Sequence, residues 1–120
     1  MHRSISALTH GIIDYLMVLI LVIGPGVAGF RGRQAALCYV LAAVHFALTF
    51  LTRFPLGVLK HVGFPIHGAI EAIVGVLMIL FPWIASFARG VLSRNFFIAI
   101  GALILMICFL TDYRGLRKVS

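Results

Sequence analysis

The chain contains one unit twice, and this duplication restricts the possible folds more than any other feature of the sequence. The first copy opens with H-G-I-I-D-Y at His10, and the second opens with H-G-A-I-E-A at His67. In both copies a carboxylate lies four residues after the histidine, and a proline (Pro25 or Pro82) ends the apolar run. The same number of residues separates each of these positions from its match in the other copy. Such internal similarity indicates that the protein is built from two copies of one structural unit.

Each copy holds two apolar runs that are long enough to cross a bilayer. A hydrocarbon core of about 30 Å needs about 20 apolar residues in a helix, with about 17 as the lower limit. The expected spans are residues 7–23, 34–52, 65–83 and 95–111, and lipid requires each of them to be helical. We therefore predict an all-α membrane protein, a four-transmembrane-helix antiparallel bundle made of two parallel two-helix repeats, residues 1–64 and 65–120.

Composition supports a surface that faces lipid. Hydrophobic residues make up 62% of the 120 residues, and only 11% are charged, against about 25% in a typical soluble domain. The net charge of +7 does not indicate nucleic-acid binding, because the basic residues lie singly or in pairs between apolar runs. The expected partners are the lipid bilayer and either further copies of the chain or a larger membrane complex.

The segments between the spans carry recognisable signals. Gly24, Pro25 and Gly26 are expected to stop the first helix, because proline lacks a backbone donor and glycine disfavours helix. The linker at residues 52–65 is too apolar for a free loop and suits a short segment lying among the lipid headgroups.

Basic residues predict the orientation of the bundle, because they are in excess on the cytoplasmic side of membrane proteins. The side with the termini and the middle linker carries six of them: Arg3, Arg53, Lys60, Arg114, Arg117 and Lys118. The opposite side carries four: Arg31, Arg33, Arg89 and Arg94. Both termini are therefore expected in the cytoplasm.

A layer of ionisable side chains is expected inside the membrane, near the cytoplasmic end of the bundle. At about 1.5 Å rise per residue, Asp14 and Glu71 lie roughly 10 Å inside their spans, and His45 lies at about the same depth. His10 and His67 lie one turn nearer the cytoplasm, each on the helix face of the carboxylate that follows it. The predicted layer comprises His10, Asp14, His45, Arg53, His67, Glu71 and Asp112.

Ionisable groups at membrane depth are costly unless paired, which makes them candidates for function. In the structural interpretation each histidine pairs with its own carboxylate and Arg53 neutralises another, which fixes the helix register. In a second interpretation His10 and His67 ligate a haem or a transition metal from two sides, with the carboxylates as ligands or partners. A proton or ion pathway in a small oligomeric transporter, or a quinone or lipid-headgroup site, are further alternatives.

His45 stands apart because its counterpart in the second copy falls near Leu103 or Ile104. It is a candidate ligand, although a lone histidine on an apolar helix is more often hydrogen-bonded to a neighbour. Nothing resembles a nucleophile with its base, a phosphate loop, a zinc quartet or a redox C-x-x-C pair, so no enzyme is predicted. The favoured prediction is a small structural or accessory membrane protein without a cofactor.

The repeated motifs resemble those of the SPW-repeat family of small bacterial membrane proteins. The residues that carry the resemblance are His10, Gly11, Asp14, Tyr15, His67, Gly68, Glu71, Pro82, Trp83, Thr111, Asp112 and Tyr113. The chain departs from the family pattern where Ser-Pro-Trp is replaced by G-P-G and F-P-W, and where T-R-F stands in place of T-D-Y. The resemblance implies a four-span protein of the bacterial inner membrane, and it implies no activity.

Overall fold

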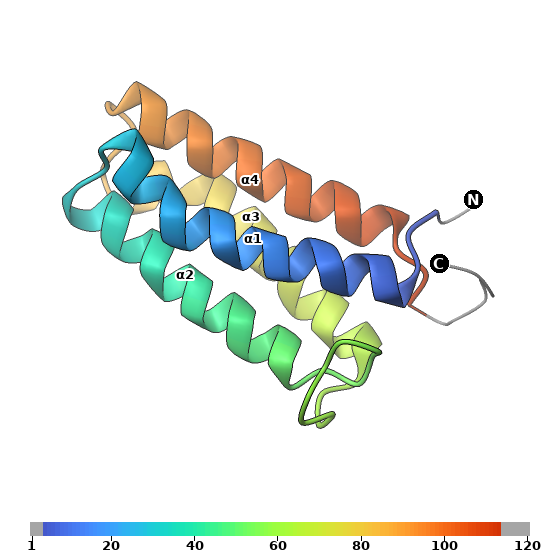
Figure 1. Cartoon of the computed structure of the whole chain (residues 1–120). Coiled ribbons are helices and arrows are strands. Elements are labelled where there is room, and N and C mark those ends of the chain that lie inside the picture. Colours follow the sequence, from blue (N-terminus) through green and yellow to red (C-terminus); the bar gives the residue numbers. More distant parts are fainter. Residues whose placement is uncertain (1–3, 114–120) are drawn as a thin grey trace.

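The protein folds as a bundle of four helices, seen here in a computed structural model that describes residues 4–113. The helices are α1 (Ala7–Ala28), α2 (Gly32–Phe50), α3 (Phe64–Ile84) and α4 (Val91–Leu110). Each helix is long and apolar enough to cross a membrane. α1 and α2 form one antiparallel hairpin, and α3 and α4 form the other (Figure 1). The predicted all-α four-helix membrane bundle is therefore confirmed.

The ends of α1 and α3 lie beyond the prolines, so the prediction that the first helix stops at Pro25 is wrong. Pro25 lies in the last turn of α1, where few further hydrogen bonds depend on it. The helix ends at Gly29, which has left-handed backbone (φ 74°) and donates its N–H to the carbonyl of Pro25. The second repeat ends α3 at the corresponding place, with Pro82 in the last turn and Ser86 at φ 62°. A left-handed residue after the proline therefore ends both helices.

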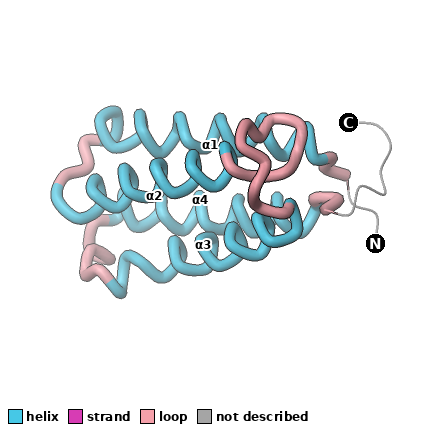
Figure 2. The backbone as a smooth tube through the Cα atoms, turned by 90° about the horizontal axis from the view of Figure 1, so that it is seen from below, coloured by secondary structure: helices cyan, strands magenta, loops and turns pink. Residues whose placement is uncertain are grey.

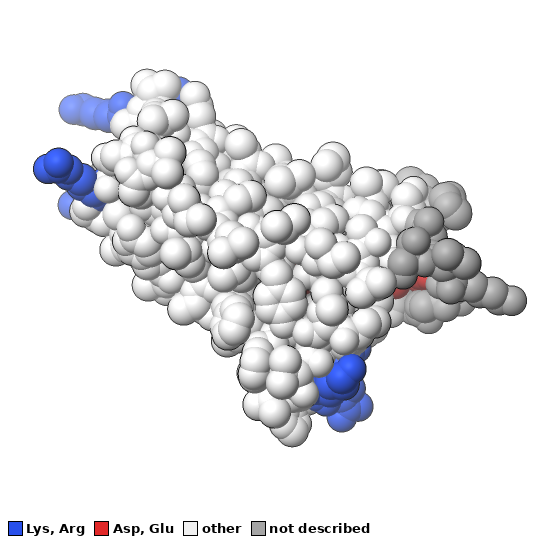
Figure 3. Space-filling model, viewed as in Figure 1, with Lys and Arg blue, Asp and Glu red and all other residues white. Residues whose placement is uncertain are grey.

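The sides of the bundle are apolar, and its basic side chains gather at the two ends. Figure 3 shows the lysines and arginines at opposite ends of the molecule, with an uncharged surface between them. Large hydrophobic side chains such as Ile73 and Met106 are exposed there, as is Trp83 at the end of α3. This distribution is that of a multi-pass membrane protein whose sides contact lipid.

The two hairpins are joined in the same way at both repeat boundaries. Ile5, which precedes α1, pairs with Thr111 after α4, while Val62, which precedes α3, pairs with Thr52 after α2. The backbone bonds correspond, because Ile5 accepts from the N–H of Asp112 at 2.7 Å and Val62 accepts from that of Arg53 at 2.7 Å. The end of each helical hairpin thus pairs with the residue that precedes the other hairpin, and this repeated arrangement gives the bundle pseudo-two-fold symmetry.

The linker between the repeats is a loop without helix that folds back along the bundle (Figure 2). Phe54 is buried and stacks on Phe64 with ring centroids 5.3 Å apart, whereas Val58 and Leu59 are exposed. The Nε atom of Arg53 donates to the carbonyl of Lys60 at 2.9 Å. The linker therefore closes the end of the bundle nearest to His10 and His67.

The second hairpin packs more tightly than the first. A β-carbon on Gly101 would lie 2.6 Å from the carbonyl oxygen of Gly75, so α3 and α4 approach more closely than side chains at those positions would allow. The first repeat has Val18 and Ala42 at the corresponding positions. Two facing glycines therefore set the spacing of α3 and α4.

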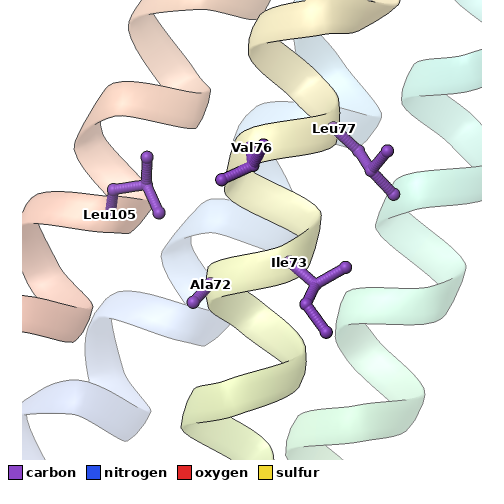
Figure 4. Close-up of a pocket in the computed structure, with 5 residues that line it drawn as sticks. All are labelled: Ala72, Ile73, Val76, Leu77 and Leu105. Carbon is purple, nitrogen blue, oxygen red and sulfur yellow. The ribbon is translucent and has the colours of Figure 1, made fainter.

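The outer face of α3 carries a shallow groove of about 330 Å³ (Figure 4). Its lining is entirely apolar: Ala72, Ile73, Val76, Leu77 and Leu105. In the first repeat the positions of Ala72 and Leu105 are held by Tyr15 and Phe46, whose rings lie 6.2 Å apart. The groove therefore marks a place where the second repeat has smaller side chains than the first.

Candidate metal centre

Five ionisable side chains from three helices meet inside the bundle, one to two turns from the end that holds the linker. His10 and Asp14 come from α1, His45 from α2, and His67 and Glu71 from α3. All five residues are at most 3% exposed. Five of the seven residues of the predicted layer are therefore brought together.

The two repeated histidines contact the carboxylates of both repeats. His10 Nε2 lies 2.9 Å from Glu71 Oε1 and 3.3 Å from Asp14 Oδ2. His67 Nε2 lies 2.9 Å from Asp14 Oδ2 and 2.9 Å from Glu71 Oε2. Each histidine therefore contacts its own carboxylate, as expected, and it also contacts the carboxylate of the other repeat, which was not predicted.

A threonine from the end of the other repeat holds the second nitrogen of each of these rings. His10 Nδ1 lies 2.8 Å from the hydroxyl of Thr111, and His67 Nδ1 lies 2.6 Å from that of Thr52. Each hydroxyl also contacts the carbonyl oxygen four residues earlier in its helix. A carbonyl oxygen can only accept, so the single proton of each hydroxyl goes to it, and the imidazole must donate through Nδ1.

This arrangement fixes the chemistry of the other ring nitrogen. Because Nδ1 carries a proton in both rings, the neutral imidazole of His10 or His67 presents a lone pair at Nε2. That lone pair faces carboxylate oxygens, which are acceptors as well. The centre therefore requires a proton or a cation between each ring and the carboxylates, supplied by a second proton on the ring, by a proton on a carboxyl group or by a bound metal ion.

His45 approaches the same carboxylates from α2. Its Nε2 atom lies 3.4 Å from Asp14 Oδ1 and 3.3 Å from Glu71 Oε2. Neither contact has hydrogen-bond geometry, and among the described residues this buried nitrogen has no hydrogen-bond partner. A buried imidazole nitrogen without a partner is costly. This one lies beside one oxygen of each carboxylate, and His67 also contacts the Glu71 oxygen, Oε2.

Weaker donors complete the surroundings of the carboxylates at matching positions of the two repeats. The hydroxyl of Thr49 donates to Asp14 Oδ2 at 3.4 Å. The thiol of Cys108 donates to Glu71 Oε1 at 3.7 Å. Cys108 is a free thiol.

Two residues of the predicted layer do not join the centre. Arg53 is exposed and donates to the linker backbone, so its expected place in the buried layer is wrong. It follows a helix that ends at Phe50, which carries it beyond the apolar part of the bundle. Asp112 is buried after α4. Among the described residues, the side chains whose ligand atoms lie close together are those of His10, Asp14, His67 and Glu71, and Asp112 is not one of them.

The aromatic cover of the centre was not predicted. Tyr113 lies over Gly68, where an added β-carbon would be 2.5 Å from its ring. Its ring is 4.7 Å from that of Phe64 and 5.6 Å from that of His10. Burial raises the pKa of the Tyr113 phenol above its ordinary value, so this side chain covers the centre as a neutral group.

Ligand atoms of His10, Asp14, His67 and Glu71 all lie within 4.8 Å of one another. With metal–ligand distances of about 2.1 Å, neighbouring ligand atoms lie about 3.0 Å apart in an octahedral site and about 3.4 Å apart in a tetrahedral one. The contacts of the His10 and His67 Nε2 atoms with the carboxylate oxygens, 2.9 to 3.3 Å, match these spacings. The four residues could therefore hold one metal ion.

No family model, curated protein or solved structure matches this chain. Any functional assignment therefore rests on the centre itself.

Proposed function

We propose that the protein is a small integral membrane protein that binds one divalent transition-metal ion between its two repeats. The ligands are Nε2 of His10, Nε2 of His67 and the carboxylates of Asp14 and Glu71. The observation that carries the proposal is the convergence of these four side chains within 4.8 Å, with both rings anchored through Nδ1. Bundle cores are a common place for metal sites whose ligands come from facing helices.

Charge supports a divalent ion. Two carboxylates balance the charge of one divalent ion when both imidazoles are neutral, so the loaded centre is neutral in a low-dielectric environment. Mixed imidazole and carboxylate ligands suit manganese, iron, cobalt or zinc better than magnesium or calcium. Anchoring of the other ring nitrogen, here by Thr52 and Thr111, is typical of metal-binding histidines.

A haem between His10 and His67 fits the geometry less well. Both Nε2 atoms contact the same oxygen, Asp14 Oδ2, at 3.3 and 2.9 Å. A porphyrin between the rings would have to displace this carboxylate. The geometry therefore favours an ion over a macrocycle.

The test is metal analysis of the full chain purified in mild detergent, followed by removal of metal and titration with Co²⁺. We expect about one ion per chain and visible absorption bands that saturate at that ratio. The double variant D14N/E71Q keeps the side-chain shapes and removes both charges, and it should lose the bands. H61Q is the matched control, because His61 is exposed in the linker.

If folded wild-type protein binds no transition metal, the proposal fails and the layer is a structural element in which two doubly protonated imidazoles balance the carboxylates. In that case H67A should lower thermal stability, because it leaves buried carboxylate oxygens without a partner. If instead pH-dependent proton flux appears in vesicles and E71Q abolishes it, a proton pathway replaces the metal site.

We also propose a location in the cell inner membrane with both termini in the cytoplasm, and membership of the SPW-repeat family. The proposed orientation depends on Arg3, Arg114, Arg117 and Lys118, which lie outside the described residues. Labelling of single introduced cysteines from either side of intact cells would test it, in a chain whose Cys38 and Cys108 are replaced by serine. Crosslinking in the same membranes would test whether the protein assembles with further copies or in a larger complex.

A further inference from the structure

We infer that His45 is a fifth ligand of this centre and sets its selectivity for nitrogen-preferring metals. The inference rests on the proposed metal site and adds to it a residue from α2, which supplies none of the four ligands named above. It concerns which metal the centre prefers, a property that the four symmetric ligands leave open.

The first observation in favour of His45 as a ligand is the position of its imidazole. Its Nε2 atom is 3.4 Å from Asp14 and 3.3 Å from Glu71, so it lies at ligand-to-ligand distance from both carboxylates. The residue is 3% exposed, and its Nε2 has no hydrogen-bond partner among the described residues. A buried imidazole nitrogen is normally satisfied by a hydrogen bond, so an unpartnered one beside two carboxylates needs a further partner, which a bound ion would supply.

The second observation is that His45 has no equivalent histidine in the second repeat. Thr49, four residues after His45 in α2, corresponds to Cys108 in α4, and this register gives Ile104 as the counterpart of His45. Ile104 is a buried apolar residue of the core. Ile104 cannot bind an ion, so at this position only the first repeat can offer an imidazole to the shared carboxylates.

The third step concerns metal preference. Two imidazoles and two carboxylates are a balanced set, and a third imidazole makes nitrogen the majority among five side-chain ligands. Affinity for imidazole rises from Mn²⁺ toward Co²⁺ and later metals, whereas Mn²⁺ is well served by oxygen. His45 should therefore raise the preference of the centre for Co²⁺ over Mn²⁺.

The experiment compares wild type with H45I, which gives the first repeat the side chain of the second. Metal-free full-length proteins in detergent are titrated with Co²⁺ and with Mn²⁺ against a competing chelator, and thermal unfolding is recorded for both. We expect H45I to bind Co²⁺ at least about tenfold more weakly, to shift the Co²⁺ absorption bands, and to lower the ratio of Co²⁺ to Mn²⁺ affinity. A loss of packing alone would weaken both metals equally and leave that ratio unchanged.

A second measurement needs no variant and covers the case in which H45I does not fold. Pulsed electron paramagnetic resonance of the Cu²⁺-loaded wild type counts the imidazoles bound to the ion. Three coupled imidazoles support the inference, and two overturn it. An unchanged affinity ratio and spectrum in folded H45I also overturn it while the metal site stands, whereas wild type that binds none of these ions overturns both.

Discussion

The two repeats agree around the centre and differ in the packing outside it. Both copies contribute one histidine, one carboxylate and one threonine, and the contacts exchange between copies: His10 and His67 each contact a threonine of the other repeat. Away from these residues the copies have diverged. The first repeat carries His45 and a filled outer face, whereas the second carries Ile104, two facing glycines and a groove.

This comparison distinguishes the features of the centre that both repeats supply from those that only one repeat supplies. The shared contacts close a ring, because each repeat orients the histidine that begins the other. One repeat folded alone would leave its histidine without a threonine and its carboxylate without the second imidazole. The features present in one copy only, His45 and the glycine contact, adjust the ligand set and the helix spacing without breaking the ring.

The largest effect is expected where the ring itself is broken. T52V and T111V keep the side-chain shape but remove the oxygen that accepts from Nδ1 of His67 or His10. Each leaves a buried donor unsatisfied, which costs about 1–3 kcal/mol of stability. Loss of the anchor should also weaken Co²⁺ binding about 10- to 100-fold. Thermal unfolding and Co²⁺ titration measure the two effects.

The two variants should behave alike, since the threonines occupy equivalent places. T9V is the control, because the hydroxyl of Thr9 contacts Ser6 at the start of α1 and lies outside the ring. A large effect in only one of the two threonine variants would show that the repeats do not contribute equally.

The next effect concerns the glycine contact that only the second repeat has. G101A places a β-carbon 2.6 Å from the carbonyl of Gly75, so α3 and α4 must separate. We expect a loss of about 1–3 kcal/mol, the usual cost of overpacking, measured by unfolding in detergent. G26A is the control, because nothing lies within 4 Å of a β-carbon there. Equal stability of G101A and wild type would show that the contact does not hold the hairpin together.

The imidazole that only the first repeat supplies can be transferred to the second repeat by two substitutions. In the double variant H45I/I104H the imidazole comes from α4 and should meet the same carboxylates from the opposite side. We expect it to recover at least about tenfold in Co²⁺ affinity over H45I, or about 1.4 kcal/mol. Failure to recover any affinity in a folded double variant would mean that position 104 does not face the ion as position 45 does.

The membrane architecture and most of the centre could be predicted from the sequence because both depend on local patterns. Apolar run length identified four spans, and the spacing of His10 and Asp14 placed them on one helix face. Depth counting brought His45 to the same level as the repeated carboxylates. These are properties of single helices, which a repeat and a rise per residue describe well.

The contacts between repeats could not be predicted in the same way. Which carboxylate His10 contacts depends on how the two hairpins pack together. That packing is set by Ile5 before α1 and Val62 before α3, each of which pairs with a threonine at the end of the other hairpin. The one available signal was the threonine at matching places in both copies, Thr52 and Thr111. Arg53 was misplaced because the apolar count extended the second span past the actual end of its helix at Phe50.

The smallest effect is expected at the donors behind the carboxylates, where one repeat has a hydroxyl and the other a thiol. Cys108 donates to Glu71 at 3.7 Å, whereas Thr49 donates to Asp14 at 3.4 Å. C108T replaces a weak thiol donor by a hydroxyl and makes the second repeat resemble the first, so stability should change by less than about 1 kcal/mol. Thermal unfolding and Co²⁺ titration of C108T and T49C would measure both directions of this exchange.

A substantially larger result at Cys108 would change the interpretation of the centre. If C108T altered the Co²⁺ spectrum while T49C did not, the sulfur would have to bind the ion, because charge-transfer bands from thiolate to Co²⁺ have no counterpart in a hydroxyl. The second repeat would then contribute its own asymmetric ligand opposite His45, and each copy would add one ligand to the shared ring. Unchanged spectra in both variants would leave His45 as the single asymmetric ligand.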